Sequence, residues 1–279
     1  MRRARPLLGT YVDIEASGRA DPVLERAVNA AFEAVARVHR LMSFHDSDSD
    51  ISRLNRRAAH EPVAVDRWTA TVLRQARRIF EATDGLFDCA VGHELMQRGL
   101  LPSQDLDHVE RGTFSGVELL RDHRVRFSAG IAIDLGGIAK GFAVDRAIAA
   151  LRGHGVREAV VNAGGDMRVI GDTPRPIHVR CPSDGPCLVP AGLLQNGAVA
   201  TSSAMTTVAR GPARLAQSMQ SAAACIDRKA YSVVAPTCLL ADALTKVLVQ
   251  VGDIHADYFG NFGACAFITS AAAVNDRAA

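Results

Sequence analysis

The stretch from Ile131 to Arg146, I-A-I-D-L-G-G-I-A-K-G-F-A-V-D-R, constrains the fold more than any other part of the chain. An apolar β-type run ends at Asp134, two glycines follow, and a helix is predicted from about Gly137 to Leu151. Free backbone N–H groups and the positive end of the helix dipole attract phosphate, and Lys140 adds a positive charge. The same residues also suit a tight connection whose glycines only satisfy backbone geometry. Taken alone, the stretch leaves both interpretations open.

A second glycine turn, V-N-A-G-G-D-M-R, runs from Val161 to Arg168. Its glycines again follow a predicted strand, and Asp166 comes directly after them. An aspartate at this point either binds an adenine or ribose hydroxyl or caps the turn. The chain has no G-x-G-x-x-G motif, which argues against a Rossmann-type nucleotide site.

A third stretch, V-V-A-P-T-C-L-L-A-D-A-L-T-K-V-L, contains Asp242, Thr245 and Lys246. On a helix these residues share one face, and we expect that face to line a cleft. A carboxylate and a hydroxyl on one face supply the oxygen ligands that Mg²⁺ prefers. The alternative is an ordinary Asp–Lys pair on the surface.

Two polar stretches beside predicted helices, Leu41 to Asn55 and Ala82 to Gly92, also contain candidate ligand contacts. His45 and Phe87 are candidates to flank a planar ring, and Asp88 is a candidate for its polar edges. The segment from His45 to Ser52 is rich in Asp and Ser, so we expect it to lie outside the core.

The remaining sequence alternates short β-type runs with helical patterns, which favours one layered α/β (α+β) domain over residues 1–279. Further helices are predicted from Asp21 to about Met42, from about Asp66 to Ala82 and from about Leu239 to Val251. The predicted strands are Tyr11–Ala16, Val125–Phe127, Ile131–Ile133, Ala159–Val161, Met167–Ile170, Ile177–Val179, Ala198–Thr201, Ser232–Val234 and Cys265–Ile268.

Composition narrows the class of protein. A net charge of +2, built from 32 basic and 30 acidic residues, gives no case for a nucleic-acid surface. No apolar run approaches the roughly 18 residues of a membrane span, and the short apolar stretch near the N-terminus does not form a signal h-region. We therefore expect a cytoplasmic protein without a membrane span. The six cysteines show no C-x-x-C pair and are expected to be mostly reduced and buried.

The order of these motifs resembles the FAD:protein FMN transferase (ApbE) family. The resemblance runs from about Pro6 to Val251. It rests on L-L-G-T, L-M-S with S-D-I-S-R-L-N, T-D-G-L-F-D, I-D-L-G-G-I-A-K-G-F-A-V-D-R, V-N-A-G-G-D, A-T-S and A-P-T-C-L-L-A-D-A-L-T. The D-L-G-G-I-A-K-G and A-P-T-C-L-L-A-D-A-L blocks are the most specific of these.

The resemblance implies a T-fold-like layered core of sheet and helices with an FAD cleft, and Mg²⁺-dependent cleavage of the FAD pyrophosphate. FMN then passes to a threonine or serine of a partner flavoprotein in a membrane redox complex; relatives often act in the periplasm, and some release FMN and AMP instead. By position, Asp242 and Thr245 are the catalytic residues and bind the metal together with the backbone carbonyl of Gly137. The FAD contacts implied by position or by the glycine turns are Leu8, His45, Leu86, Phe87, Asp88, Asp134, Lys140 and Asp166.

Three positions depart from the family pattern. His45 stands where tyrosine is common, and Lys246 stands where a threonine is common. The stretch Ala224–Ala230, A-C-I-D-R-K-A, lacks the histidine of the usual H-I-I-D-P-R-T-G block. Lysines on helices usually face solvent, so we expect Lys246 to point outward, with an ammonium next to the pyrophosphate as the alternative. The departures leave a second function open, an FAD-binding protein or FAD pyrophosphatase that has lost transfer.

Overall fold

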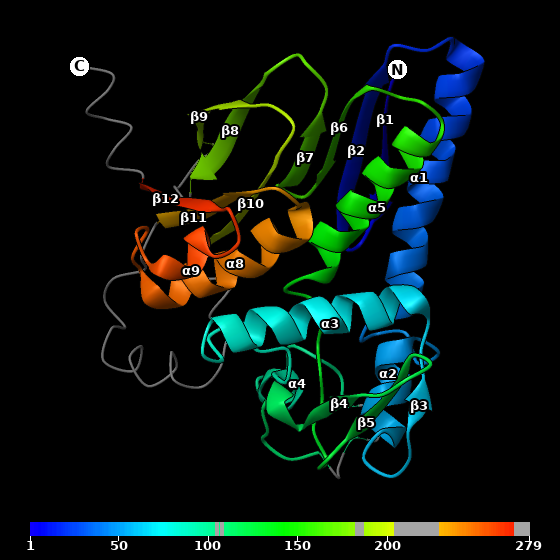
Figure 1. Cartoon of the computed structure of the whole chain (residues 1–279), viewed down its shortest axis with the longest axis vertical. Coiled ribbons are helices and arrows are strands. Elements are labelled where there is room, and N and C mark those ends of the chain that lie inside the picture. The colour runs from blue at the N-terminus through cyan, green and yellow to red at the C-terminus, as the bar shows by residue number, and fades with distance from the viewer. Residues whose placement is uncertain (104–105, 107–108, 182–186, 204–228, 271–279) are drawn as a thin grey trace. The chain divides into compact units, whose positions relative to one another are not determined.

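The computed structural model describes residues 1–103, 106, 109–181, 187–203 and 229–270 (Figure 1). The described residues divide into two compact units. Unit 1 takes its residues from Met1–Arg37, Lys140–Met205 and Cys225–Ala279, and unit 2 takes its described residues from Val38–Ala139. A single domain over residues 1–279 stays a prediction.

A seven-stranded antiparallel sheet forms the centre of unit 1, in the order β1-β2-β6-β7-β10-β11-β12. Because every neighbouring pair is antiparallel, the fold is of the α+β kind, and the prediction of a layered sheet and helices is confirmed. The strands are β1 (Arg2–Leu7), β2 (Thr10–Ser17), β6 (Glu158–Ala163), β7 (Asp166–Ile170), β10 (Ala198–Ser203), β11 (Lys229–Ala235) and β12 (Cys265–Ser270).

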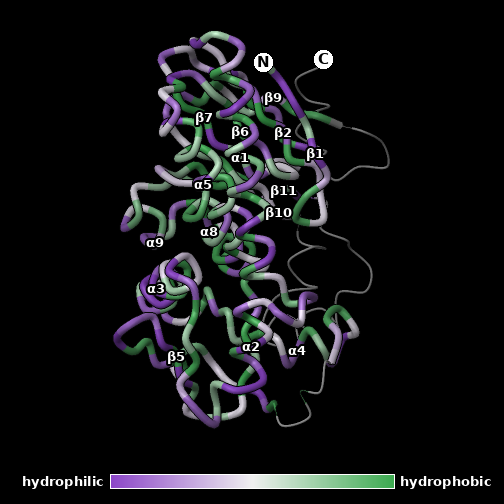
Figure 2. The backbone as a smooth tube through the Cα atoms, turned by 90° about the vertical axis from the view of Figure 1, so that its right-hand side faces the viewer, coloured by the Kyte–Doolittle hydropathy of each residue, from purple (hydrophilic) through white to green (hydrophobic). Residues whose placement is uncertain are grey.

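The first two strands show how sequence pattern sets their places. In β2, Val12, Ile14 and Ala16 are buried at every second position, as the predicted alternation requires. β1 lies at the edge of the sheet and carries three arginines and Pro6, and its start is hydrophilic in Figure 2. Charged residues and proline protect an exposed edge from pairing with another chain.

Helices and a hairpin cover the two faces of the sheet around β10. The helices of unit 1 are α1 (Asp21–Met42, which continues into unit 2), α5 (Ala139–Gly153), α8 (Cys238–Val251) and the short α9 (Asp257–Gly260). α8 packs against β7, β10 and β11. The hairpin of β8 (Arg175–Cys181) and β9 (Cys187–Leu194) contributes Ile177 and Leu194 to an apolar cluster with Val199 of β10. Since successive side chains of a strand alternate, Ser202 faces the opposite side from Val199 and points to α8.

Unit 2 contains a small three-stranded sheet, β3-β5-β4, with several helices. Its elements are α2 (Asp50–Arg57), β3 (Val63–Ala64), α3 (Arg67–Ala82), α4 (Gly92–Gln97), the 3-10 turn Phe114–Gly116, β4 (Val117–Leu119) and β5 (Arg124–Phe127). The predicted helix start at Asp66 is confirmed, because the Asp66 carboxylate caps α3 by accepting a hydrogen bond from the Trp68 N–H at 2.8 Å.

The expectation that His45 to Ser52 lies outside the core is wrong for its second half. Ser49, Asp50 and Ser52 are buried. The Ser49 hydroxyl accepts from the Ser52 N–H, and the Asp50 carboxylate accepts from the Asp66 N–H at 2.8 Å and the Thr69 hydroxyl at 2.6 Å. These polar groups tolerate burial because each has a partner.

The predicted strand Ile131–Ile133 does not form. The buried Asn55 side chain takes its place as a hydrogen-bond partner, accepting from the Ile133 N–H at 2.8 Å and donating to the Ile133 carbonyl at 3.0 Å. The Ala132 carbonyl accepts from the Gly92 N–H. An apolar run shows that a segment is buried, but its backbone partners here come from a side chain and a loop rather than from a strand.

The described residues bear on two further expectations. No helix among these residues is long and apolar enough to cross a membrane. Cys89 and Cys238 are buried thiols outside any disulfide, as predicted, whereas the thiol of Cys265 is exposed.

Candidate functional site

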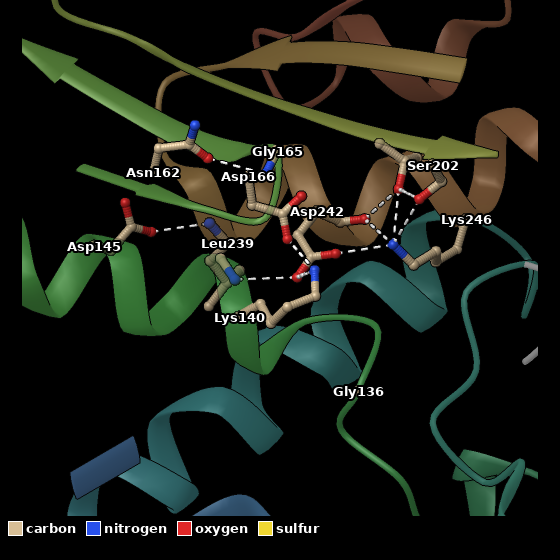
Figure 3. Close-up of polar contacts among 12 residues, drawn as sticks. Gly136, Lys140, Asp145, Asn162, Gly165, Asp166, Ser202, Leu239, Asp242 and Lys246 are labelled. Carbon is tan, nitrogen blue, oxygen red and sulfur yellow. Dashed lines mark hydrogen bonds and ion pairs between the residues drawn. The ribbon is translucent and has the colours of Figure 1, made fainter. Parts of the chain in front are cut away.

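Two lysines and two aspartates of unit 1 form a charged cluster beside the start of α5 (Figure 3). Lys140 Nζ donates to an oxygen of Asp166 and lies 3.8 Å from Asp242 Oδ2. Lys246 Nζ donates to Asp242 Oδ1 at 2.8 Å. Asp242 is completely buried, while the side chains of Lys140 and Lys246 keep 28% and 18% of their surface exposed. Two buried carboxylates therefore pair with two lysines whose side chains are only partly exposed.

The turn between β6 and β7 places Asp166. Gly164 and Gly165 have φ values of 64° and 104°, which side chains other than hydrogen rarely allow. The Asn162 side chain accepts a hydrogen bond from the Gly165 N–H at 2.9 Å and closes the turn. Asp166 follows as the first residue of β7 and is buried beside Lys140. The glycines thus serve backbone geometry, while Asp166 joins the cluster.

Asp145 of α5 holds the start of α8. Its carboxylate accepts from the backbone N–H groups of Cys238 and Leu239, both at 2.9 Å, and from Arg168 at 2.5 Å. Burial raises the pKa of Asp145, and Arg168 opposes that rise. A carboxylate at a helix N-terminus satisfies free N–H groups and complements the dipole. This contact orients α8 so that Asp242 faces α5.

Gly141 brings the two helices into backbone contact. Its N–H donates to Asp242 Oδ2 at 3.0 Å. A Cβ atom at this position would lie 2.2 Å from the Cys238 carbonyl oxygen, which is backbone and has little freedom to move. The glycine in the A-K-G-F sequence is therefore required by the approach of α5 to α8.

We expect Gly141→Ala to lower the free energy of unfolding by about 1–3 kcal/mol, because the added methyl group forces the helices apart. Gly153→Ala is the matched control on the same helix, since a Cβ there meets nothing within 4 Å, and it should be neutral or slightly stabilising. Urea unfolding of both variants measures the difference. Equal stabilities would contradict the assigned role of Gly141.

The two carboxyl groups of the cluster, those of Asp166 and Asp242, have pKa values shifted in opposite directions. Burial and the Asp242 charge raise the pKa of Asp166 to about 6, against the opposing effect of Lys140 and Lys246. Burial opposes ionisation of Asp242 as well, but Lys140 and Lys246 outweigh it, so that the pKa of Asp242 lies below its usual value. The pKa of Lys140 rises despite burial because it faces both carboxylates. Asp242 ionises more readily than Asp166 because Lys246 and the Gly141 N–H donate hydrogen bonds to its carboxylate.

Cys238 lies beside this cluster but is unsuited to act as a nucleophile. Burial, and then the charges of Asp166 and Asp145, raise the pKa of its thiol well above the ordinary value. A thiol is nucleophilic as its thiolate. The residue is therefore a small apolar packing group at the start of α8.

Lys246 points inward, so the outward orientation favoured by its sequence position is wrong. Its ammonium donates to Asp242 Oδ1 at 2.8 Å, Thr245 Oγ1 at 2.9 Å, Ser202 Oγ at 3.0 Å and the Asp242 carbonyl at 3.2 Å. The pair is also not an ordinary surface pair, because Asp242 and Thr245 are both completely buried. Lys246 points inward because the face of α8 that carries it packs on β10.

The implied Mg²⁺ does not fit the oxygens that Asp242 and Thr245 present in this arrangement. They have the chemistry that Mg²⁺ prefers, but the Lys246 ammonium already occupies the position among them. Among the described residues, no group of three or more His, Cys, Asp and Glu side chains is arranged to hold a metal ion.

Ser202 is a site residue that motif reading did not single out. Its hydroxyl lies 2.8 Å from Thr245 Oγ1 and accepts from Lys246. The only sequence signal was its membership of the A-T-S block. Its partner in space is 43 residues away along the chain, so only packing brings them together.

The other residues implied by the resemblance lie in different places. Leu8 is half-buried at a left-handed position after β1. In unit 2, His45 is exposed, and Phe87 is only 3% exposed, so its ring packs in the interior. The Asp88 carboxylate accepts from the N–H groups of Ala90 and Phe114. Burial raises the pKa of Asp88.

The remaining residues of the set are Leu86, which lies between α3 and α4, and Asp134 and Gly137, which come just before α5. Asp134 accepts from the Gly136 N–H at 3.1 Å and stabilises the glycine turn, while its own N–H donates to the Cys89 carbonyl. Leu86 and Gly137 are half-buried. The structure thus brings together Lys140, Asp166, Asp242 and Thr245 within unit 1. Of the stretch Ala224–Ala230, residues 224–228 lie outside the described part of the chain.

Comparison with known proteins agrees with this class of fold, an antiparallel sheet covered by helices. The ApbE family model matches residues 8–261, and the chain belongs to the ApbE family. The chain is 29% identical over 185 residues to an FAD:protein FMN transferase of Treponema pallidum, covering 61% of this chain and 51% of the relative. It is 31% identical over 180 residues to the one of Vibrio cholerae, covering 60% of this chain and 53% of the relative.

The aligned part of the chain therefore spans about half the length of these curated relatives. Among solved structures, the ApbE protein of Thermotoga maritima superimposes with a TM-score of 0.76 at 27% identity. That likeness covers 99% of this chain and 98% of the other.

Proposed function

We propose that this chain cleaves FAD and transfers FMN to a serine or threonine of an acceptor flavoprotein. The observation that carries the proposal is the family match over residues 8–261, which includes every residue of the charged cluster. The names of the curated relatives, FAD:protein FMN transferase, support it. That the acceptor belongs to a membrane redox complex follows from the resemblance alone and is part of the proposal.

The cluster suits the chemistry of this reaction. Attack on the FAD pyrophosphate is phosphoryl-type transfer, which depends on positioning and charge neutralisation rather than on a covalent protein intermediate. Lys140 and Lys246 supply two ammonium groups on partly exposed side chains, and the buried Asp166 and Asp242 hold them in place. Preorganised charges stabilise a transition state without a cost of reorganisation. Within the proposal, Leu8, His45, Leu86, Phe87, Asp88 and Asp134 contact the flavin or adenosine.

Mg²⁺ is part of what the resemblance implies, with Asp242, Thr245 and Gly137 as its ligands. When bound, such an ion neutralises charge on phosphate oxygens. In this chain the side-chain oxygens of Asp242 and Thr245 already accept hydrogen bonds from Lys246, so the proposed cleavage of FAD does not depend on this ion.

The proposal predicts that the purified chain binds FAD in preference to NAD and ATP and releases AMP from it. Equilibrium dialysis against each nucleotide, followed by chromatographic detection of AMP, measures both properties. Supplying an acceptor flavoprotein should add the mass of an FMN group to it. Tighter binding of NAD than of FAD, or FAD that stays intact, would contradict the proposal.

A second function is favoured by one sequence observation, the absence of the histidine in the stretch Ala224–Ala230. Without a group to take the proton of the acceptor hydroxyl, water becomes the acceptor and the chain is an FAD pyrophosphatase. AMP and free FMN would then appear together, while the mass of the acceptor protein would not change. The transferase is distinguished by a covalent flavin on the acceptor.

A further inference from the structure

The side chain of Lys246 ends inside a set of four oxygen atoms supplied by β10 and α8 (Figure 3). We call this set the oxygen cage: Asp242 Oδ1, the Asp242 carbonyl, Thr245 Oγ1 and Ser202 Oγ. Their distances from Nζ range from 2.8 to 3.2 Å. Hydroxyl, carbonyl and carboxylate oxygens together are a cation site, and here the cation is covalently part of the chain.

The oxygen cage needs a positive charge because its carboxylate has no access to water. Asp242, Thr245 and Ser202 are all buried, and a buried carboxylate without a counter-charge is strongly disfavoured. Lys140 compensates part of the negative charge of the two carboxylates, but it lies nearer to Asp166 than to Asp242. Lys140 and Lys246 together balance Asp166 and Asp242. Removing either ammonium leaves the pair of buried carboxylates with one uncompensated negative charge.

An ammonium and a divalent ion cannot use the oxygen cage together. Mg²⁺ binds oxygen at about 2.1 Å, so an ion held by Asp242 Oδ1 and Thr245 Oγ1 would take the lone pairs that now accept from Lys246. Both species are cations and repel each other at this range. The cage therefore holds one or the other.

We propose that Lys246 is a built-in cation that replaces a divalent metal ion in the oxygen cage. The wild-type chain then holds no divalent ion at Asp242, and FAD cleavage, which rests on the proposed function, proceeds without added metal. Lys246 acts by supplying charge and by positioning Asp242. Replacing it with a small neutral residue converts the oxygen cage into a site for a divalent ion.

Mn²⁺ binding without FAD tests the proposal directly, using electron paramagnetic resonance to measure free Mn²⁺. Lys246→Thr should gain a saturable site that is roughly tenfold or more tighter than any in the wild type. Adding Asp242→Asn to that variant should remove the gained site. Lys229→Thr is the matched control, because it removes the same charge from an exposed position at the start of β11 and should behave as the wild type does.

Thermal unfolding gives a second readout of the same variants. Lys246→Thr should melt below the wild type in EDTA and recover with Mg²⁺, whereas the wild-type melting temperature should not respond to Mg²⁺. If Lys246→Thr does not fold, Lys246→Ala, which is also small and neutral and has the highest helix propensity, is measured in its place. The proposal is overturned if the wild type binds Mn²⁺ through Asp242, or if removing the ammonium creates no site.

The cleavage assay separates this proposal from the proposed function. AMP release by the wild type should persist in EDTA. A strict requirement of this release for Mg²⁺ would overturn the proposal that Lys246 replaces the metal ion. Absence of AMP from the wild type under every condition would instead contradict the proposed function. The Mn²⁺ result would still stand in that case, because it is obtained without FAD.

Discussion

Replacing Asp242 by asparagine is expected to lower the free energy of unfolding by about 3 kcal/mol or more and to stop FAD cleavage. The carboxylate is completely buried, accepts from Lys246 and the Gly141 N–H, and lies close to Lys140. Asparagine keeps the volume but removes the charge, so that Lys246 loses its ionic partner. The sequence alone predicted that Asp242 lines a cleft, and its complete burial adds a role in stability.

Chemical denaturation and the AMP assay measure the two effects of Asp242→Asn. Asp253→Asn is the matched control, because it lies just after α8 and is exposed. Surface substitutions of this kind usually change stability by less than about 0.5 kcal/mol. A stable, inactive Asp242→Asn protein would show that the aspartate acts in chemistry but does not hold the cluster together.

The stability contributed by Asp166 should fall as the pH rises from 4 to 7. Its pKa is raised to about 6, mainly by burial and by the charge of Asp242, with Lys140 and Lys246 opposing. A carboxyl group whose pKa is higher in the folded state binds its proton more tightly there. Its favourable contribution is therefore complete below the unfolded pKa and is lost as the pH passes the folded pKa.

Asp166→Asn removes this titration, so the free energy of unfolding of the variant, relative to that of the wild type, should rise by about 2 kcal/mol between pH 4 and pH 7. Asp242 does not mask the effect, because its lowered pKa keeps it ionised over this range. Denaturation of both proteins at several pH values measures the difference. Asp172→Asn, at an exposed position after β7, should keep a constant offset from the wild type. An equally constant offset for Asp166→Asn would show that the carboxyl group does not titrate in this window.

Local patterns in the sequence determined the main elements of the fold. The alternation of β2, the cap of α3 at Asp66 and the helical spacing of α8 depend on neighbours within a few residues, and the structure shows all three. The helix starting near Gly137 begins at Ala139. The order of the glycine and aspartate motifs identified the family, because such blocks recur together only where one fold requires them. Lys140, Asp166, Asp242 and Thr245, which the structure brings together, all lie in these blocks.

What only the tertiary structure decided is which way these side chains face. Helical spacing places Asp242, Thr245 and Lys246 on one side of α8, but it contains no information on whether that side meets water or a sheet. The packing of α8 on β10 answers this, and it turns Lys246 toward Ser202. The failed strand at Ile131–Ile133 has the same origin, since its partner Asn55 is 78 residues away. Contacts between distant segments depend on how the layers pack, and local propensity does not encode that packing.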